Sequence, residues 1–135
     1  MKLISITRLR LVSIRYLPCF MWIAWRSAQQ AKRAAGNLQT KLVWDANLTF
    51  WTLTAWESET AMRSFMTTGD HRRAMPKLLN WCDEAAVVHW HQETDELPSL
   101  LEAHRRMVSE GRISRVNHPS ADHLARHIAA PKIHS

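Results

Sequence analysis

The chain has 135 residues, a formal net charge of +6 and a pI near 10.0. A chain of this length has room for one hydrophobic core, which argues against two independent domains. The positive charge permits attraction to nucleic acid, anionic lipid or acidic small molecules. The eight histidines and the scattered acidic residues dilute any single basic patch, so charge alone selects none of these partners.

Two features bear on the compartment. Cys19 and Cys82 form no CxxC pair, and two reduced thiols are typical of a cytoplasmic protein. The apolar run from Tyr16 to Trp25 follows basic residues and so imitates a secretory signal, but Pro18 interrupts it and no small-residue cleavage site follows. A spanning helix needs roughly 20 apolar residues. We therefore expect a cytoplasmic protein without a membrane partner, the alternative being a membrane-surface helix in this region.

The first half of the chain alternates strand and helix patterns. A strand is predicted within residues 3–13, and a helix begins at Pro18, because proline is tolerated at a helix's first position. Gly36-Asn37 ends this helix. Its apolar residues recur at helical spacing: Phe20, Ala24, Ala28, Ala31 and Ala35. A second strand is predicted over Leu38 to Asp45, with a turn near Ala46-Asn47.

Residues 49–75 change hydrophobic period at one point, Trp56-Glu57-Ser58. Before it, large apolar residues and threonines alternate with a period of two, which is typical of a strand. After it, Ser58 can cap a helix, and Ala61, Met62, Phe65 and Met66 form its apolar stripe. Gly69 can supply the left-handed residue that ends this helix, and Asp70 can cap a further turn that begins at His71.

The second half adds a strand and a helix. Ala85 to His91 is predicted as the fourth strand, and Glu96 to Arg112 as an amphipathic helix in which Glu102 and Arg106 have the spacing of an ion pair. We therefore expect one domain over residues 1–112 and a basic, flexible tail over residues 113–135. The order βαββαβ predicts an α+β, ferredoxin-like antiparallel sheet with both helices on one face and an extra C-terminal helix.

That topology leaves the second face of the sheet uncovered. The third strand carries large apolar side chains on both of its faces, including Trp51 and Leu53 on one and Phe50 and Trp56 on the other. An exposed apolar face of this size is typical of an interaction surface. A face-to-face homodimer would bury it without any further sequence.

The run TLTAWESETAMRSFM, continued by GDHRRAM, resembles the third strand and second helix of the antibiotic-biosynthesis monooxygenase superfamily. The similarity covers residues 3–91, is strongest over 49–75, and includes a weaker match at YLPCFMWIAWRSAQQAKRAAGN. GDHRRAM also resembles a segment of spheroidene-monooxygenase-like relatives. This resemblance implies a homodimeric α/β barrel and an oxidoreductase of the monooxygenase type.

The resemblance leaves the cofactor open between haem and none. Haem-degrading members of the superfamily use a tryptophan in the second helix and a histidine about three turns later. The aligned positions here are Phe65 and Met75, so the haem-degrading apparatus is not supported. Cofactor-independent oxygenation, also known in the superfamily, would need a dry apolar pocket.

The candidate site lies between the helices and the sheet. His71 is the candidate catalytic residue, as a proton donor or acceptor, and Arg72 beside it is a candidate substrate-binding residue. Trp56, Phe65, Trp22 and Trp25 are the candidates for an aromatic substrate pocket, although seven tryptophans can also serve to fill a core. A structural role for His71 as a solvent-facing residue of a first turn also remains open.

Other sites receive less support from the sequence. His89 and His91 point to one face of a strand and could ligate a metal, but no third ligand stands at a fixed spacing, so we expect no metal site. No RNP or helix-turn-helix signature accompanies the arginines, which argues against nucleic acid as a partner. The leading hypothesis is a monooxygenase-like enzyme for a small hydrophobic or aromatic molecule. The alternative is a noncatalytic dimeric ligand-binding or stress-response module.

Overall fold

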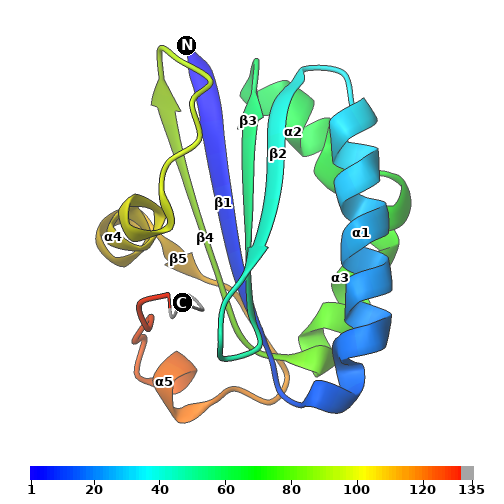
Figure 1. Ribbon diagram of the computed structural model, residues 1–135, viewed down its shortest axis with the longest axis vertical. Coiled ribbons are helices and arrows are strands. Elements are labelled where there is room, and N and C mark those ends of the chain that lie inside the picture. The colour runs from blue at the N-terminus through cyan, green and yellow to red at the C-terminus, as the bar shows by residue number, and fades with distance from the viewer. Residues whose placement is uncertain (132–135) are drawn as a thin grey trace.

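The computed structural model describes residues 1–131, except for the side chains of Asp70 and His71. Most of the chain belongs to regular elements (Figure 1). In chain order they are β1 (Lys2–Leu11), the 3₁₀ turn η1 (Ile14–Tyr16), α1 (Leu17–Arg33), β2 (Asn37–Trp44), β3 (Thr49–Trp56), α2 (Glu59–Met66), α3 (Gly69–Trp81), β4 (Cys82–Gln92), α4 (Leu100–Glu110), β5 (Arg112–Ile113) and α5 (Ala121–Leu124).

The strands form one antiparallel sheet in the order β2-β3-β1-β4-β5. Helices α1, α2 and α3 lie on one face of this sheet, and α4 and α5 lie on the opposite side (Figure 1). The α+β, ferredoxin-like fold predicted from the sequence is therefore confirmed. The fifth strand was not predicted, because its two residues are too short to show a hydrophobic period.

The structure refines the helix boundaries. Ser58 caps α2 as predicted, since its hydroxyl accepts the backbone N–H of Ala61 at 3.1 Å, and Gly69 has a positive φ of 60°. The predicted cap at Asp70 is wrong: α3 begins at Gly69 with Thr68 in the N-cap position. It then runs 13 residues through Pro76, a proline that obscured the helical pattern in the sequence.

The last long helix is shorter than predicted. It begins at Leu100 rather than Glu96, because Pro98 precedes it and Ser99 caps it by accepting the backbone N–H of Glu102 at 3.2 Å. The predicted ion pair between Glu102 and Arg106 is present at 3.1 Å. The helix thus keeps its predicted amphipathic character over Leu100–Glu110.

The second face of the sheet is covered by the chain itself. Ile4, Ile6, Trp51 and Leu53 are at most 1% exposed, and they share a core with Ala103 and Met107 of α4 and with Ile128. Residues after 113 therefore contribute to this core. The prediction that this face is left uncovered for a homodimer to bury is therefore not supported, and the homodimer stays a prediction.

A buried ion network lies on this face, between the second half of β1 and the start of β4. Arg8 on β1 donates to the Glu84 carboxylate on β4 at 2.7 Å, and their side chains are 4% and 5% exposed. Arg10 pairs with Asp83 at 3.0 Å, and the hydroxyl of Ser120 donates to Glu84 at 2.8 Å. The network connects the segment before α5 to two central strands.

The two cysteines are expected to differ in reactivity. Cys82 is fully buried, and burial together with the negative charge of Asp83 raises the pKa of its thiol to about 12, whereas Cys19 is exposed. Because the thiolate is the reactive form, one thiol per native chain should react with Ellman's reagent and two should react in urea. Rapid reaction of both thiols in the native protein would contradict this structure around Cys82.

Candidate functional site

A cavity of about 310 Å³ separates the sheet from helices α1, α2 and α3. Its floor comes from β1, β3 and β4, its roof from the three helices, and one side from β5 and the residues that follow it. Most of the lining is apolar. The large apolar residues are Leu9, Phe20, Ile23, Leu42, Trp56, Met62, Phe65, Met66, Met75, Leu78 and Leu79.

Small side chains on α1 leave the space. Ala24, Ala28 and Ala31 recur at helical spacing on the face of α1 that lines the cavity, together with Ser27. Leucines at these positions would fill the gap between helix and sheet in the ordinary way of a packed core. The alanine stripe seen in the sequence is therefore what makes a cavity possible.

Two cross-strand pairs of β1 and β3 place hydroxyl groups on the floor of the cavity. Ser5 on β1 lies opposite Thr54 on one side and His89 on the other, and Thr7 lies opposite Thr52. Thr54 donates to the backbone carbonyl of Ser5 at 3.2 Å. Within residues 1–131, the hydroxyls of Ser5, Thr7 and Thr52 have no such partner, so they are available to a polar atom of a ligand.

Trp56 contributes both an apolar wall and a polar group. It is fully buried at the end of β3, and its ring packs against Phe65 of α2 with centroids 5.3 Å apart. Its buried indole N–H has no hydrogen-bond partner among the described residues. Buried donors are almost always paired in native proteins, so this unpaired donor is unusual.

His89 is the ionisable group on the floor, and part of its side chain is open to solvent. Its pKa lies below the ordinary histidine value because of burial first, and then because of the positive charge of Arg112; the carboxylate of Glu59 opposes this shift. A histidine with a lowered pKa is neutral at pH 7 and can accept a proton. The side chain thus has the protonation state of a general base.

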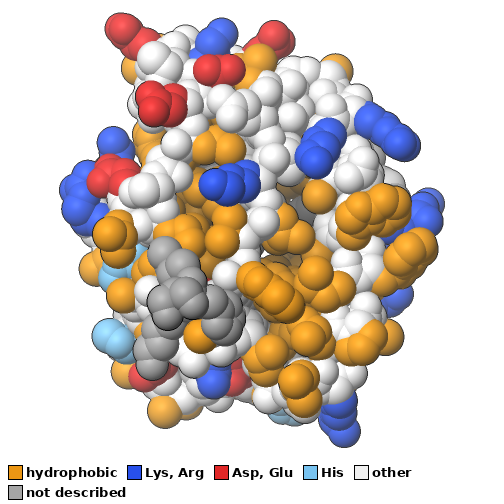
Figure 2. Space-filling view, in the orientation of Figure 1, with side chains coloured by type: hydrophobic (Ala, Val, Ile, Leu, Met, Phe, Trp, Pro, Cys, Tyr) orange, Lys and Arg blue, Asp and Glu red, His pale blue; other side chains and the backbone are white. Residues whose placement is uncertain are grey.

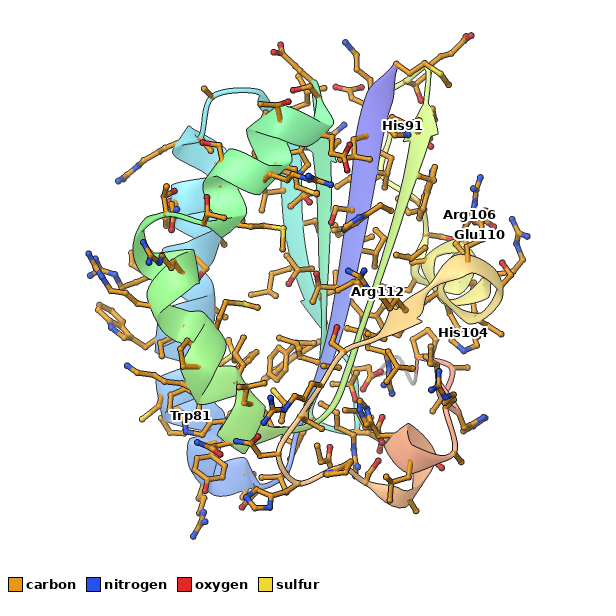
Figure 3. The ribbon with its side chains drawn as sticks, turned by 180° about the vertical axis from the view of Figure 1, so that it is seen from behind. Trp81, His91, His104, Arg106, Glu110 and Arg112 are labelled. Carbon is orange, nitrogen blue, oxygen red and sulfur yellow. The ribbon has the colours of Figure 1, made fainter. Side chains whose placement is uncertain are left out.

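The charges that line the cavity are positive. Among the described residues, the charged side chains that line the cavity are Arg112 on β5 and Arg115 beyond it, and no Asp or Glu lines it. Arg112 lies opposite Val87 in the register of β4 and β5, next to His89 on the same face. Figure 3 shows Arg112 on this short strand, at the side of the sheet away from β2.

The structure brings together some of the residues predicted for the site. Trp56 and Phe65 both line the cavity. Trp25 lines a separate groove between α1 and α2, of about 620 Å³, which shares Phe65 with the cavity. Arg72 is exposed and lines neither hollow. His71 lies in the first turn of α3, but its side chain is outside the described residues, so its catalytic role stays a prediction.

Trp22 lies on the outer surface of α1. It is 59% exposed, stacks on Trp25 at 5.8 Å, and lies 5.7 Å from the guanidinium carbon of Arg26. Figure 2 shows apolar side chains gathered over the side of the molecule where α1 runs. Among residues 1–131, no helix has both the length and the apolar character to cross a bilayer.

Sequence reasoning did not select His89 for the site. It considered His89 and His91 as metal ligands and expected no metal site, because no third ligand stands at a fixed spacing. The described residues hold no group of three or more His, Cys, Asp or Glu side chains that could bind an ion. The alternation of Ala85, Val87 and His89 already placed this imidazole on the helical face. Arg112 and Arg115 carried no such signal, because they fell at the end of a predicted helix and in a predicted tail.

A haem fits the described residues poorly. His89 could ligate iron and Arg112 and Arg115 could pair with carboxylates. The cavity volume of about 310 Å³, however, stands at the low end of the roughly 300–1,000 Å³ range for small-molecule sites. The space suits a compact organic molecule better than a macrocycle, and no step below involves haem.

Solved structures share this fold at low sequence identity. An antibiotic biosynthesis monooxygenase matches with a TM-score of 0.61 and 14% identity, over 68% of this chain and 99% of the other. Rv0793 from Mycobacterium tuberculosis matches with a TM-score of 0.63 and 9% identity, over 70% and 97%. SnoaB, a cofactor-independent oxygenase from Streptomyces nogalater, matches with a TM-score of 0.59 and 13% identity, over 73% and 98%.

The structural neighbours thus include proteins of the antibiotic-biosynthesis monooxygenase type, as the sequence resemblance implied, and they establish the fold. No curated protein sequence matches this chain. One family model does, over residues 16–112, which includes α1, strands β2, β3 and β4, and α4. The chain therefore belongs to the family described as a domain of unknown function, DUF3291.

Proposed function

We propose that this protein is a monooxygenase-like enzyme that binds a small hydrophobic or aromatic molecule in the cavity between the sheet and helices α1 to α3. The observation that carries the proposal is the combination of an apolar cavity with a neutral imidazole, His89, on its floor. The neighbouring folds support the reaction type, since one of them is named as a cofactor-independent oxygenase. The resemblance also supports a homodimer, and the two separate cysteines support a cytoplasmic location.

An oxygenase without a cofactor must take its electrons from the substrate. A methylene group between aromatic rings is acidic enough to lose a proton to His89, and the resulting carbanion can bond to O₂. The protonated imidazole then returns its proton to the peroxide oxygen. Loss of water from this hydroperoxide breaks the O–O bond and removes the second C–H proton, so that CH₂ and O₂ become C=O and H₂O.

The described residues have distinct roles in this reaction. His89 moves the proton, and the apolar walls formed by Trp56 and Phe65 hold the rings and exclude water. The hydroxyls of Ser5, Thr7 and Thr52 on the floor can hold the oxygen atoms of the substrate. His71 remains the other candidate for the base.

The second candidate function is a ligand-binding module without chemistry. The same apolar cavity would support it. Turnover of a bound molecule separates the two functions, because a binding module would return its ligand unchanged.

Anthrone is a suitable probe, because its methylene lies between two aromatic rings and its oxidation to anthraquinone changes the absorption spectrum. We expect the purified protein to consume one O₂ for each anthraquinone formed, at a rate above that of the buffer. The measurement combines an oxygen electrode with absorbance.

A cavity-filling variant supplies the control. Ala28→Phe places a ring in the space beneath α1 and should reduce the rate to that of the buffer, while circular dichroism confirms that the helices remain. Anthrone that binds to the wild-type protein without oxygen consumption would favour the ligand-binding module. Equal rates for wild type and Ala28→Phe would place the reaction outside the cavity.

A further inference from the structure

The positive end of the cavity deepens this proposal and rests on it. We propose that the natural ligand is an anionic aromatic or alicyclic molecule, whose carboxylate or equivalent oxyanion is held by Arg112 and Arg115 while its apolar body lies against Trp56 and Phe65. The substrate class is therefore narrower than a small hydrophobic molecule.

The first argument is the lack of protein partners for these two arginines. Five arginines in the described residues are paired with carboxylates: Arg8, Arg10, Arg63, Arg105 and Arg106 each lie 2.6–3.1 Å from an acidic oxygen. Neither Arg112 nor Arg115 has an ion pair within residues 1–131. Two guanidinium groups beside an apolar cavity without acids leave a net positive site.

The second argument is position. Arg112 lies directly opposite Val87, and Val87 is two residues from His89 on the cavity face of β4. A cation at this place lies beside both the proposed base and the apolar space. Both arginines are exposed, so an anion that they bind would lie between solvent and the apolar space.

The third argument is the chemistry of the guanidinium group. Its planar fork matches a carboxylate through two parallel N–H···O hydrogen bonds, which fixes both the position and the orientation of the bound acid. Ser114 lies between the two arginines in the chain and also lines the cavity, which offers a further donor. An anion held at this end would direct the rest of the molecule along the floor toward Trp56.

Two dyes that differ by one charged group test the inference. The probes are 8-anilinonaphthalene-1-sulfonate and its uncharged counterpart N-phenyl-1-naphthylamine, and fluorescence titration gives their affinities. We expect the wild-type protein to bind the sulfonate at least tenfold more tightly. Arg112→Gln and Arg115→Gln should each weaken sulfonate binding by about tenfold or more and change binding of the uncharged dye by less than twofold.

Two further variants locate the effect. Lys77→Gln removes the same unit of charge from an exposed position on α3 outside the cavity, and it should leave both affinities unchanged. Ala28→Phe should abolish binding of both dyes, which excludes the exposed tryptophans of α1 as the binding site.

The outcomes separate this inference from the proposed function. Equal affinities for the two dyes, or equal losses for both dyes in the arginine variants, would overturn the anionic ligand and leave a hydrophobic site. If neither dye bound in the cavity, both proposals would be wrong.

Discussion

Replacement of His89 by glutamine is expected to lower the rate of anthrone oxidation by roughly 10²–10⁴-fold, the range for loss of a general acid or base. Glutamine keeps a polar side chain of similar reach on the cavity floor but cannot accept a proton at neutral pH. Binding of the uncharged dye should change by less than twofold, because the apolar walls remain. The loss should therefore fall on kcat rather than on KM.

His91→Gln is the matched control. His91 lies two residues farther along β4 and is exposed like His89, but it does not line the cavity, so this variant should keep the wild-type rate. Figure 3 shows His91 near the end of β4 that is farther from Arg112. A His89→Gln protein with full activity would disprove the assignment, and a large loss in His71→Ala would then return the role to the residue predicted from sequence.

The pH profile gives a second readout of His89. A base must be neutral to accept a proton, and burial together with Arg112 keeps the pKa of His89 below its ordinary value. Activity should thus be complete at pH 7 and fall only as the pH drops below about 6.5. In Arg112→Gln the positive charge is gone, so the pKa of His89 rises and the loss of activity at low pH should begin at a higher pH. If the pH profile of the rate did not move, another group would control the rate.

The sheet and its helices were predictable because their signals are local. The change of period at Trp56-Glu57-Ser58 placed β3, the cap and α2 almost to the residue. The alternation of β1 and β4 gave two central strands, and the order of the elements then restricted the topology. The full length of α3 was missed for a physical reason, because Pro76 in the middle of α3 imitates the end of a helix.

The second face of the sheet was not predictable in the same way. It is covered by α4 and by a residue as far along the chain as Ile128, and this contact depends on distant segments that share no local pattern. The polar composition of residues 113–135 suggested a flexible tail. Burial there depends on a few residues, such as Val116 and Ile128, and on the hydroxyl of Ser120 bound to Glu84.

In the candidate site, too, the residues with local sequence signals were predictable and those that depend on long-range contacts were not. Trp56 and Phe65 were found because they lie on the predicted strand and helix that enclose the pocket. Trp22 was predicted to line the pocket. In the structure, the face of α1 that points to the sheet carries the small residues Ala24 and Ala28, and Trp22 lies on the outer surface. Arg112 and Arg115 reach the cavity only because β5 pairs with β4, which is a long-range event.

Replacement of Arg8 by methionine is expected to lower the free energy of unfolding by about 3–5 kcal/mol, the cost of removing one partner of a buried ion pair. The carboxylate of Glu84 would remain buried with the Ser120 hydroxyl at 2.8 Å and with Arg10 at 3.4 Å, but without its 2.7 Å partner. Trp51 would also lose the guanidinium group that lies 5.7 Å from its ring. Urea unfolding followed by tryptophan fluorescence measures the change.

Arg105→Met is the matched control, because Arg105 forms an equally short ion pair with Glu102 on the surface of α4. Its side chain is 67% exposed, so the loss should be much smaller than that of Arg8→Met. The contrast between the two variants would show that burial, rather than the ion pair alone, makes Arg8 important. A loss below 1 kcal/mol in Arg8→Met would contradict the buried network.

The pH dependence of Arg8→Met distinguishes a buried charge from lost packing. In the wild-type protein, burial alone would raise the pKa of Glu84, but the hydrogen bonds from Arg8 and Ser120 outweigh it and the pKa lies below its ordinary value. The stability from this carboxylate is present above the unfolded pKa of about 4.3 and is lost as the pH falls through the lower folded value. Without Arg8, burial dominates and the pKa of Glu84 rises. As the pH falls, protonation of Glu84 then removes the cost of its buried charge in the variant. The stability gap between variant and wild type should therefore narrow below about pH 5, whereas a loss of packing alone would leave it constant.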